Sequence, residues 1–241
     1  MSSYTNADQI WISSRLKSLG KPGGDKKAQA YIGSPYPALG LSTAQFRQVH
    51  KEFKERRPQM NVSDVNALAK RLWSFETYEE KVFAIGLLGR HEKLLSDASW
   101  HLMDKMTDDA IGWALSDGLA SGPVSAYAHA HPARYNDILR WTKSKDYWRR
   151  RASTYALNEF IRAGELDKPF ELLERLLYDE EFWVQRAVGT WLRECWKKDQ
   201  SRTERFLRKH VKGLPPVTIT VATERASKSF RNELRSKSRM G

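Results

Sequence analysis

Aromatic residues recur along this chain at intervals of 35 residues, and this repeat constrains the fold more than any other feature. Two of the repeats share a longer motif, at residues 148–152 and 183–187, in which Trp is followed three residues later by Arg and then by Ala. The four aromatic positions, which form a ladder, are Tyr78, Trp113, Trp148 and Trp183. A period of this length, combined with helical spacing of apolar residues, is typical of helical pairs stacked into a solenoid. The sequence therefore predicts an all-α superhelix.

Apolar residues are spaced as in helices over most of the chain. Leu68 and Leu72, for example, are four residues apart, which places them on one helix face. The exception is residues 217–221, where Val, Thr and Ile alternate after two prolines, which predicts a short strand or an extended linker. We expect a single domain over residues 1–241, with residues 236–241 as a frayed basic tail.

The chain is strongly basic. Its 41 Lys and Arg residues and 29 Asp and Glu residues give a formal net charge of +12. Such a charge indicates a polyanionic partner, with nucleic acid the first choice and an anionic membrane surface the second. Residues 201–241 hold 11 basic and three acidic residues, which is +8 of the total. Five basic side chains of this stretch are expected to clamp the phosphates of a duplex, namely Arg225, Lys228, Arg231, Arg235 and Lys237.

Several classes of site have no counterpart in the sequence. Cys195 is the single cysteine, which excludes a disulfide and favours a reducing compartment. None of the six histidines pairs with another His or a Glu at a convincing ligand spacing, and no phosphate-binding loop or serine-hydrolase motif occurs. We therefore expect no metal and no cofactor. No apolar stretch approaches the ~18 residues of a membrane span, and no secretory signal is visible, so we expect a cytoplasmic protein.

The position three residues after each ladder aromatic is mostly basic. It holds Lys81, Arg151 and Arg186 in three of the four repeats. Because a charged side chain is costly to bury without a partner, we expect these three to reach solvent or an anion. If the ladder marks the start of the second helix of each pair, aromatic and basic residues line one groove. The alternative is that the ladder aromatics pack between repeats as core.

The repeat that starts at Trp113 breaks this pattern. Its third position is Ser116, and the next position, which is small or apolar in the other repeats, is Asp117. Trp113 and Asp117 are four residues apart and so share a helix face. Because a carboxylate in a DNA-binding groove repels phosphate, its presence favours chemistry, in which an anion stabilises positive charge in a transition state. The alternatives are a helix N-cap or a salt bridge to Arg151.

An ordered set of motifs resembles the AlkD-type DNA alkylation-repair glycosylases, which are built from HEAT-like repeats. Trp113 and Asp117 match the family's Trp-x-x-x-Asp motif, which carries its catalytic carboxylate. Residues 148–152 match its Trp-x-x-Arg-Ala motif, and residues 182–189 match the next repeat. The first-repeat motif is matched by Tyr31, Leu39-Gly40-Leu41-Ser42-Thr43 and Arg47. The resemblance covers roughly residues 28–235, and we expect a right-handed superhelix of about six HEAT-like helical pairs.

One position departs from the family pattern. The family often has a lesion-facing tryptophan directly after the glycine matched by Gly189, whereas this chain has Thr190 there and Trp191 one residue later. A step of one residue turns a helical side chain by about 100°. We therefore expect Trp191 to face the core, with consequences for the range of lesions and the rate.

The resemblance implies hydrolysis of the N-glycosidic bond of alkylated purines, such as 3-methyladenine and 7-methylguanine, in double-stranded DNA during base-excision repair. Asp117 would stabilise the oxocarbenium-like sugar and orient a water, and Trp113 would pack against the sugar and favour the cationic lesion. The residues expected to bind DNA are Tyr31, Thr43, Arg47, Trp148, Arg151, Arg186 and Thr190. The protein would act as a monomer without a cofactor, and would associate with the nucleoid when bound to DNA.

Two other functions share most of these features. A non-catalytic solenoid that recognises distorted or branched duplex would keep every basic residue and differ only at Trp113 and Asp117. A protein-interaction scaffold, which is a common use of helical solenoids, would have no affinity for DNA at moderate salt. The basic residues after the ladder aromatics argue against the scaffold.

Overall fold

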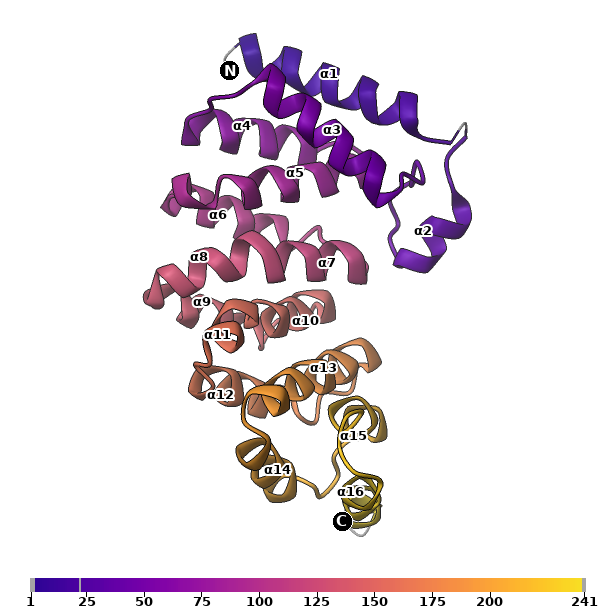
Figure 1. The fold of residues 1–241 in the computed structure, drawn as a ribbon, viewed down its shortest axis with the longest axis vertical. Helices are drawn as coiled ribbons and strands as arrows, with labels where there is room; N and C mark the ends of the chain where they lie inside the picture. The colour runs from indigo at the N-terminus through magenta and orange to yellow at the C-terminus, as the bar shows by residue number, and fades with distance from the viewer. Residues whose placement is uncertain (1–2, 22, 240–241) are drawn as a thin grey trace. The chain divides into compact units, whose positions relative to one another are not determined.

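The computed structural model describes residues 3–21 and 23–239, and all regular structure in these two ranges is helical, with no strand (Figure 1). The predicted all-α fold class is therefore confirmed. The chain divides into two compact units, residues 1–127 and residues 128–241, which are described separately.

Unit 1 is built from helices that pack on one another in pairs. Helix α4 packs on α5, α1 packs on α3 and α4, and α5 packs on α7. The helices are α1 (Ser3–Leu19), α2 (Lys26–Ile32), α3 (Thr43–Arg56), α4 (Val62–Trp73), α5 (Tyr78–Arg90), α6 (Asp97–Met106) and α7 (Trp113–Leu119). A short π-helical segment, η2 (Ala120–Val124), leads into α8 (Ser125–Ala130), which contains the boundary between the units.

Local sequence signals explain where the helices of unit 1 begin and end. Ser42 caps α3 through a capping box with Gln45, and Asn61 caps α4 by accepting from the backbone N–H of Asp64. Helix α2 ends at Gly33, whose positive φ of 65° suits a residue without a Cβ. The apolar residues spaced as in helices, such as Leu68 and Leu72, are buried in the core, as predicted.

Unit 2 is centred on one long helix, α13 (Phe182–Lys198), which packs against α10, α12, α14 and α15. The other helices are α9 (Tyr135–Trp141), α10 (Tyr147–Tyr155), α11 (Asn158–Ala163), α12 (Asp167–Leu176), α14 (Gln200–Lys209), α15 (Pro216–Ala222) and α16 (Lys228–Arg239). Gly189 brings α13 and α15 close together, because a Cβ at this position would lie 2.8 Å from the Cβ of Val221 and 2.9 Å from the carbonyl oxygen of Thr218.

The strand or linker predicted for residues 217–221 is wrong, because this segment forms α15. Pro216 stands at the first helical position, where its fixed φ and missing N–H are favourable. Two of the β-branched side chains that suggested a strand are buried instead. Thr218, which is fully buried, donates from its hydroxyl to the carbonyl of Gln185 at 3.0 Å, and Ile219 is 1% exposed. Tertiary packing therefore overrides local propensity here.

The C-terminal segment was expected to fray from residue 236. Helix α16 continues through residues 236–239, and Ser238 donates from its hydroxyl to the carbonyl of Leu214 at 2.8 Å. Residues 240 and 241 of the expected tail lie outside the described residues.

Candidate active site

The ladder aromatics stand at the starts of helices. Tyr78 and Trp113 are the first residues of α5 and α7 in unit 1. Trp148 and Trp183 are the second residues of α10 and α13 in unit 2. Five of the predicted site residues lie in unit 1, namely Tyr31, Thr43, Arg47, Trp113 and Asp117. The other four lie in unit 2, namely Trp148, Arg151, Arg186 and Thr190.

Helix α7 presents Trp113 and Asp117 on a face that is open to solvent. Both side chains are partly exposed, whereas Leu115 and Leu119 on the opposite face are completely buried. Asp117 is the fifth residue of α7, so its carboxylate does not cap the start of this helix. The N-cap alternative for Asp117 is therefore excluded. The backbone carbonyl of Asp117 accepts from the hydroxyl of Ser121 at 2.7 Å, in the segment that continues the helix.

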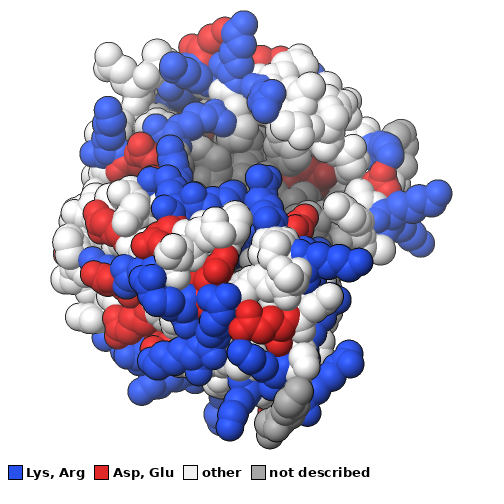
Figure 2. Space-filling view, turned by 60° about the horizontal axis from the view of Figure 1, so that its bottom comes forward, with Lys and Arg blue, Asp and Glu red and all other residues white. Residues whose placement is uncertain are grey.

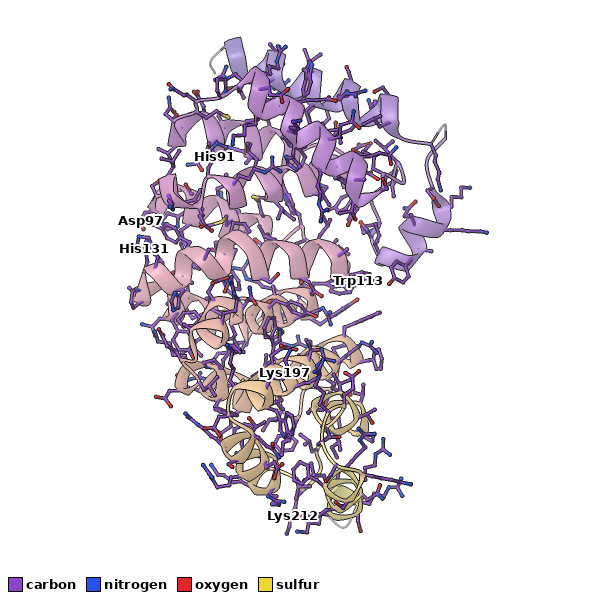
Figure 3. All side chains as sticks on the ribbon, viewed as in Figure 1. His91, Asp97, Trp113, His131, Lys197 and Lys212 are labelled. Atoms are coloured by element: carbon purple, nitrogen blue, oxygen red, sulfur yellow. The ribbon has the colours of Figure 1, made fainter. Side chains whose placement is uncertain are left out.

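Trp113 is joined to Tyr31 on helix α2, and Figure 3 shows Trp113 at the N-terminal end of α7. The indole Nε1–H of Trp113 donates to the carbonyl oxygen of Tyr31 at 2.8 Å. The two rings meet edge to face, with centroids 5.4 Å apart and planes at 88°. Tyr31 is 75% exposed, which is unusual for a large aromatic side chain. The structure thus brings two residues that are 82 positions apart into one exposed aromatic surface.

A close approach of two glycines makes this contact possible. Gly112 precedes α7 with a φ of 91°, a conformation that favours glycine. A Cβ at Gly112 would lie 2.5 Å from the carbonyl oxygen of Gly33, which ends α2. A side chain at position 112 would therefore push α2 away from α7.

Thr43 and Arg47 lie on one face of α3 and are both exposed. Thr43 is the first residue of the helix, directly after the Ser42 cap, and Arg47 follows one turn later. Both side chains are accessible to a ligand, as a role in DNA binding requires.

Two of the basic side chains that were expected to reach solvent are buried. Lys81 is 4% exposed, donates from Nζ to the carbonyl of Trp73, and lies 4.2 Å from the ring centroid of Tyr36. Burial lowers the pKa of Lys81. A backbone carbonyl and aromatic faces therefore replace water around this cation, and the expectation for Lys81 is wrong.

Arg151 is also 4% exposed, so it does not reach solvent. Its guanidinium donates from Nη1 to the carbonyl of Trp183 at 2.6 Å and from Nη2 to the hydroxyl of Tyr155 at 2.9 Å. It also lies 4.9 Å from the ring centroid of Tyr155. These contacts tie α10 to the start of α13. Arg186, at the same position of the next repeat, is exposed as predicted.

The ladder aromatics of unit 2 differ in exposure. Trp148 is 7% exposed and packs against Trp183, with ring centroids 5.8 Å apart, so the core alternative holds for Trp148. Trp183 is partly exposed. Phe182, directly before Trp183, is 51% exposed. Phe182 is not among the predicted site residues, although Tyr147 occupies the same position before Trp148.

The substitution of Thr190 for the family tryptophan has the predicted result. Trp191 is 6% exposed and meets Tyr155 edge to face at 5.2 Å, so it faces the core. Thr190 is partly exposed, and its hydroxyl donates to the carbonyl of Arg186 at 3.0 Å. Position 190 therefore presents a small polar side chain where the family often has an indole.

The C-terminal helices carry exposed basic side chains. Figure 2 shows many Lys and Arg side chains on this face, with Asp and Glu side chains between them. Arg225, Lys228, Arg235 and Lys237 are exposed. Arg231 is half-buried, because it donates to the carbonyl of Thr223 at 2.6 Å. Four of the five side chains expected to clamp phosphates are thus accessible.

Groups that other kinds of chemistry would use are scarce in the described ranges. Cys195 is completely buried, and burial raises the pKa of its thiol to about 12. Among the residues that the structure describes, no three His, Cys, Asp or Glu side chains are grouped as a metal ion would require. No described helix is long and apolar enough to cross a membrane.

Comparisons with known proteins identify the fold and the family of the chain. No curated protein sequence matches the chain significantly. A solved structure described as a predicted DNA alkylation repair enzyme from Enterococcus faecalis matches with a TM-score of 0.76 at 16% identity, over 87% of this chain and 98% of that chain. AlkD2 from Streptococcus mutans matches with a TM-score of 0.58 at 16% identity, over 88% of this chain and 96% of its own. The protein smu.31 from Streptococcus mutans UA159 matches with a TM-score of 0.55 at 17% identity, over 81% of this chain and 96% of that chain.

These structures show that the fold of the chain is like that of AlkD proteins, which consist of HEAT-like helical repeats. Residues 12–226 match the protein family described as DNA alkylation repair enzyme. Because this match covers most of the 241 residues, the chain belongs to the DNA alkylation repair enzyme family.

Proposed function

We propose that the protein is a DNA glycosylase, which hydrolyses the N-glycosidic bond of alkylated, cationic purines such as 3-methyladenine and 7-methylguanine in duplex DNA. The observation that carries this proposal is the joint exposure of Trp113 and Asp117 on one face of α7, beside the exposed ring of Tyr31. Membership of the DNA alkylation repair enzyme family supports it.

Alkylation supplies much of the driving force of the reaction. The alkylated purine carries a positive charge, so it leaves with the electron pair of the bond to C1′ and becomes neutral. The sugar then carries the positive charge as an oxocarbenium-like species. The carboxylate of Asp117 would stabilise this charge and orient a water, whose oxygen bonds to C1′ and whose proton is released to the carboxylate or to solvent. Because the leaving group is activated already, we propose that neither a metal nor a cofactor takes part.

The aromatic surface would hold the damaged nucleotide. Trp113 and Tyr31 would pack against the sugar and backbone, and the face of the indole would favour the cationic lesion. Thr43, Arg47 and Arg186 are exposed and would hold the duplex through its phosphates. Arg151 is buried against Trp183 and Tyr155, so we assign it to holding α10 against α13.

Release of free base from methylated duplex by the wild-type protein and by Asp117→Asn tests this proposal. The glycosylase account requires release by the wild type and its loss in the variant, with duplex binding retained. We further propose that the protein acts as a monomer on double-stranded DNA.

A second function, recognition of distorted duplex without base release, is favoured by one observation. Position 190 presents a threonine where the family often has an indole, and Trp191 is buried. A protein of this kind would bind the same DNA with the same salt dependence but release no base.

A further inference from the structure

We propose that Glu79 is a positioning residue, which fixes the loop between α2 and α3 and thereby holds Tyr31 against Trp113. The effect of Glu79 on base release rests on the proposed function, whereas its effect on the geometry of the aromatic pair does not.

Glu79 binds the loop directly. It is the second residue of α5, next to the ladder residue Tyr78, and it is 1% exposed. Its carboxylate accepts from the backbone N–H of Leu39 and from that of Gly40, each at 2.8 Å. Hydrogen bonds to an ionised acceptor are stronger than neutral ones. Two of them on adjacent amides fix both the position and the orientation of this part of the loop.

Helix α2 has few contacts of its own that could hold it in place. Of its seven residues, all of which the structure describes, Ile32 alone is buried. Segments with little buried apolar surface open at low free-energy cost. The position of Tyr31 therefore depends on the contacts at the end of α2 and in the loop that follows.

Those contacts come from two directions. At the end of α2, the indole of Trp113 binds the carbonyl of Tyr31, and Gly112 lies against Gly33. Further along the loop, the N–H of Tyr78 donates to the carbonyl of Pro37 at 3.0 Å, next to the bonds made by Glu79. The start of α5 thus holds the loop at residues 37–40, and the start of α7 holds the end of α2. Without Glu79, the loop would lose the bonds at Leu39 and Gly40, and the bond from Tyr78 to Pro37 would remain.

Glu80 provides a matched comparison. It follows Glu79 in α5, is 2% exposed, and accepts hydrogen bonds from two side chains. Its donors are the hydroxyl of Ser13 in α1 and the hydroxyl of Thr77 at the start of α5, so it does not bind the loop. The same substitution at Glu80 removes a buried carboxylate from the same helix turn and leaves the contacts of the loop in place.

The experiment compares Glu79→Gln with Glu80→Gln in the full-length protein. In Glu79→Gln, the amide NH₂ replaces one acceptor oxygen and faces a backbone N–H. We expect hydrogen exchange at the amides of Leu39 and Gly40 to quicken by about tenfold or more, as the loss of one charge-assisted bond predicts. We also expect the indole N–H resonance of Trp113 to shift, and single-turnover release of 7-methylguanine to slow by about tenfold. In Glu80→Gln the exchange rates, the Trp113 resonance and the rate of base release should stay near their wild-type values. Both variants should melt at a lower temperature than the wild type.

The proposal would be overturned if the amides of Leu39 and Gly40 exchanged in Glu79→Gln at the wild-type rate. It would also be overturned if exchange quickened but the Trp113 resonance did not shift. Equal changes in the two variants would also overturn it, because they would show a general loss of stability. If the wild-type protein releases no base, the proposed function fails, while exchange and the indole resonance still decide the role of Glu79. If Glu79→Gln does not fold, Glu79→Asp, which keeps the charge but is one methylene shorter, is subject to the same measurements and the same outcomes.

Discussion

The indole N–H of Trp113 donates a 2.8 Å hydrogen bond to the backbone carbonyl of Tyr31, and the two rings meet edge to face. Trp113 therefore makes a structural contact through its N–H, while its ring remains partly exposed and accessible to a ligand. This arrangement couples the position of α2 to the start of α7, four residues before Asp117. The proposed active site consequently depends on a residue of α2 that is 82 positions away in the chain from Trp113.

Substitution of Trp113 tests this double role. Trp113→Phe keeps an aromatic ring but removes the N–H, so we expect the unfolding free energy to fall by about 1 kcal/mol and base release to slow by roughly tenfold. Chemical denaturation and single-turnover assays measure the two effects. Tyr31→Phe is the control, because the acceptor is a backbone carbonyl and remains in place. Trp113→Phe with wild-type release would show that the hydrogen bond is not needed.

Arg151 and Arg186 each lie three residues after a ladder aromatic, but their substitution should affect DNA binding and stability differently. Arg186 is exposed, so Arg186→Ala should weaken duplex binding at every sequence and reduce the salt slope of affinity by about 1. Arg151 is buried and donates hydrogen bonds to Trp183 and Tyr155, so Arg151→Ala should lower the unfolding free energy by about 2–3 kcal/mol and leave the salt slope unchanged. Binding titrations at several salt concentrations, together with denaturation, separate the two. A reduced slope for Arg151→Ala would restore it as a phosphate contact.

His50 should make the protein less stable in acid. Its ring stacks on Phe83 with centroids 3.9 Å apart, and burial, assisted by the charge of Arg90, lowers the pKa of His50 from 6.5 to about 3. Below pH 6.5 the unfolded chain therefore takes up a proton that the folded chain does not, which costs up to roughly 1.4 kcal/mol per pH unit until about pH 3.

The unfolding free energy of His50→Leu should accordingly fall less between pH 7 and pH 4 than that of the wild type. Exposed His101, changed to Gln, is the control and should follow the wild-type curve. Parallel curves for His50→Leu and the wild type would show that the buried imidazole titrates normally.

Two glycines give a matched test of helix packing. A Cβ at Gly189 would lie 2.8 Å from the Cβ of Val221, so Gly189→Ala should separate α13 from α15 and destabilise unit 2 by about 1–3 kcal/mol. Among the described residues, no atom outside the helix backbone lies within 4 Å of a Cβ built on Gly89, so Gly89→Ala should stabilise the protein by about 0.5–1 kcal/mol. Denaturant unfolding measures both, and equal effects would contradict the close approach of α13 and α15.

The sequence predicts those features that depend on neighbouring residues. The period of 35 residues predicts equivalent positions for Trp113 and Trp183, and both stand at helix starts. The spacing of four residues places Asp117 on the same face as Trp113. The one-residue displacement of Trp191 likewise predicts its burial, since only the turn angle of the helix is needed.

Features that depend on distant partners could not be predicted in this way. Arg151 is buried because a carbonyl 32 residues later accepts its hydrogen bond, and Lys81 is buried because Trp73 and Tyr36 surround its ammonium group. The residues of α15 have high β propensity, and their helix is set by packing on α13. Charge and propensity alone contain no information about these partners.

The central claim is that the carboxylate of Asp117 acts on the damaged sugar, and release of 7-methylguanine from methylated duplex tests it most directly. Asp117→Asn keeps the size of the side chain and removes its charge. The account predicts release by the wild type, a loss of about a hundredfold or more in the variant, and duplex affinity that is unchanged or slightly higher. Base release by Asp117→Asn at the wild-type rate would contradict it.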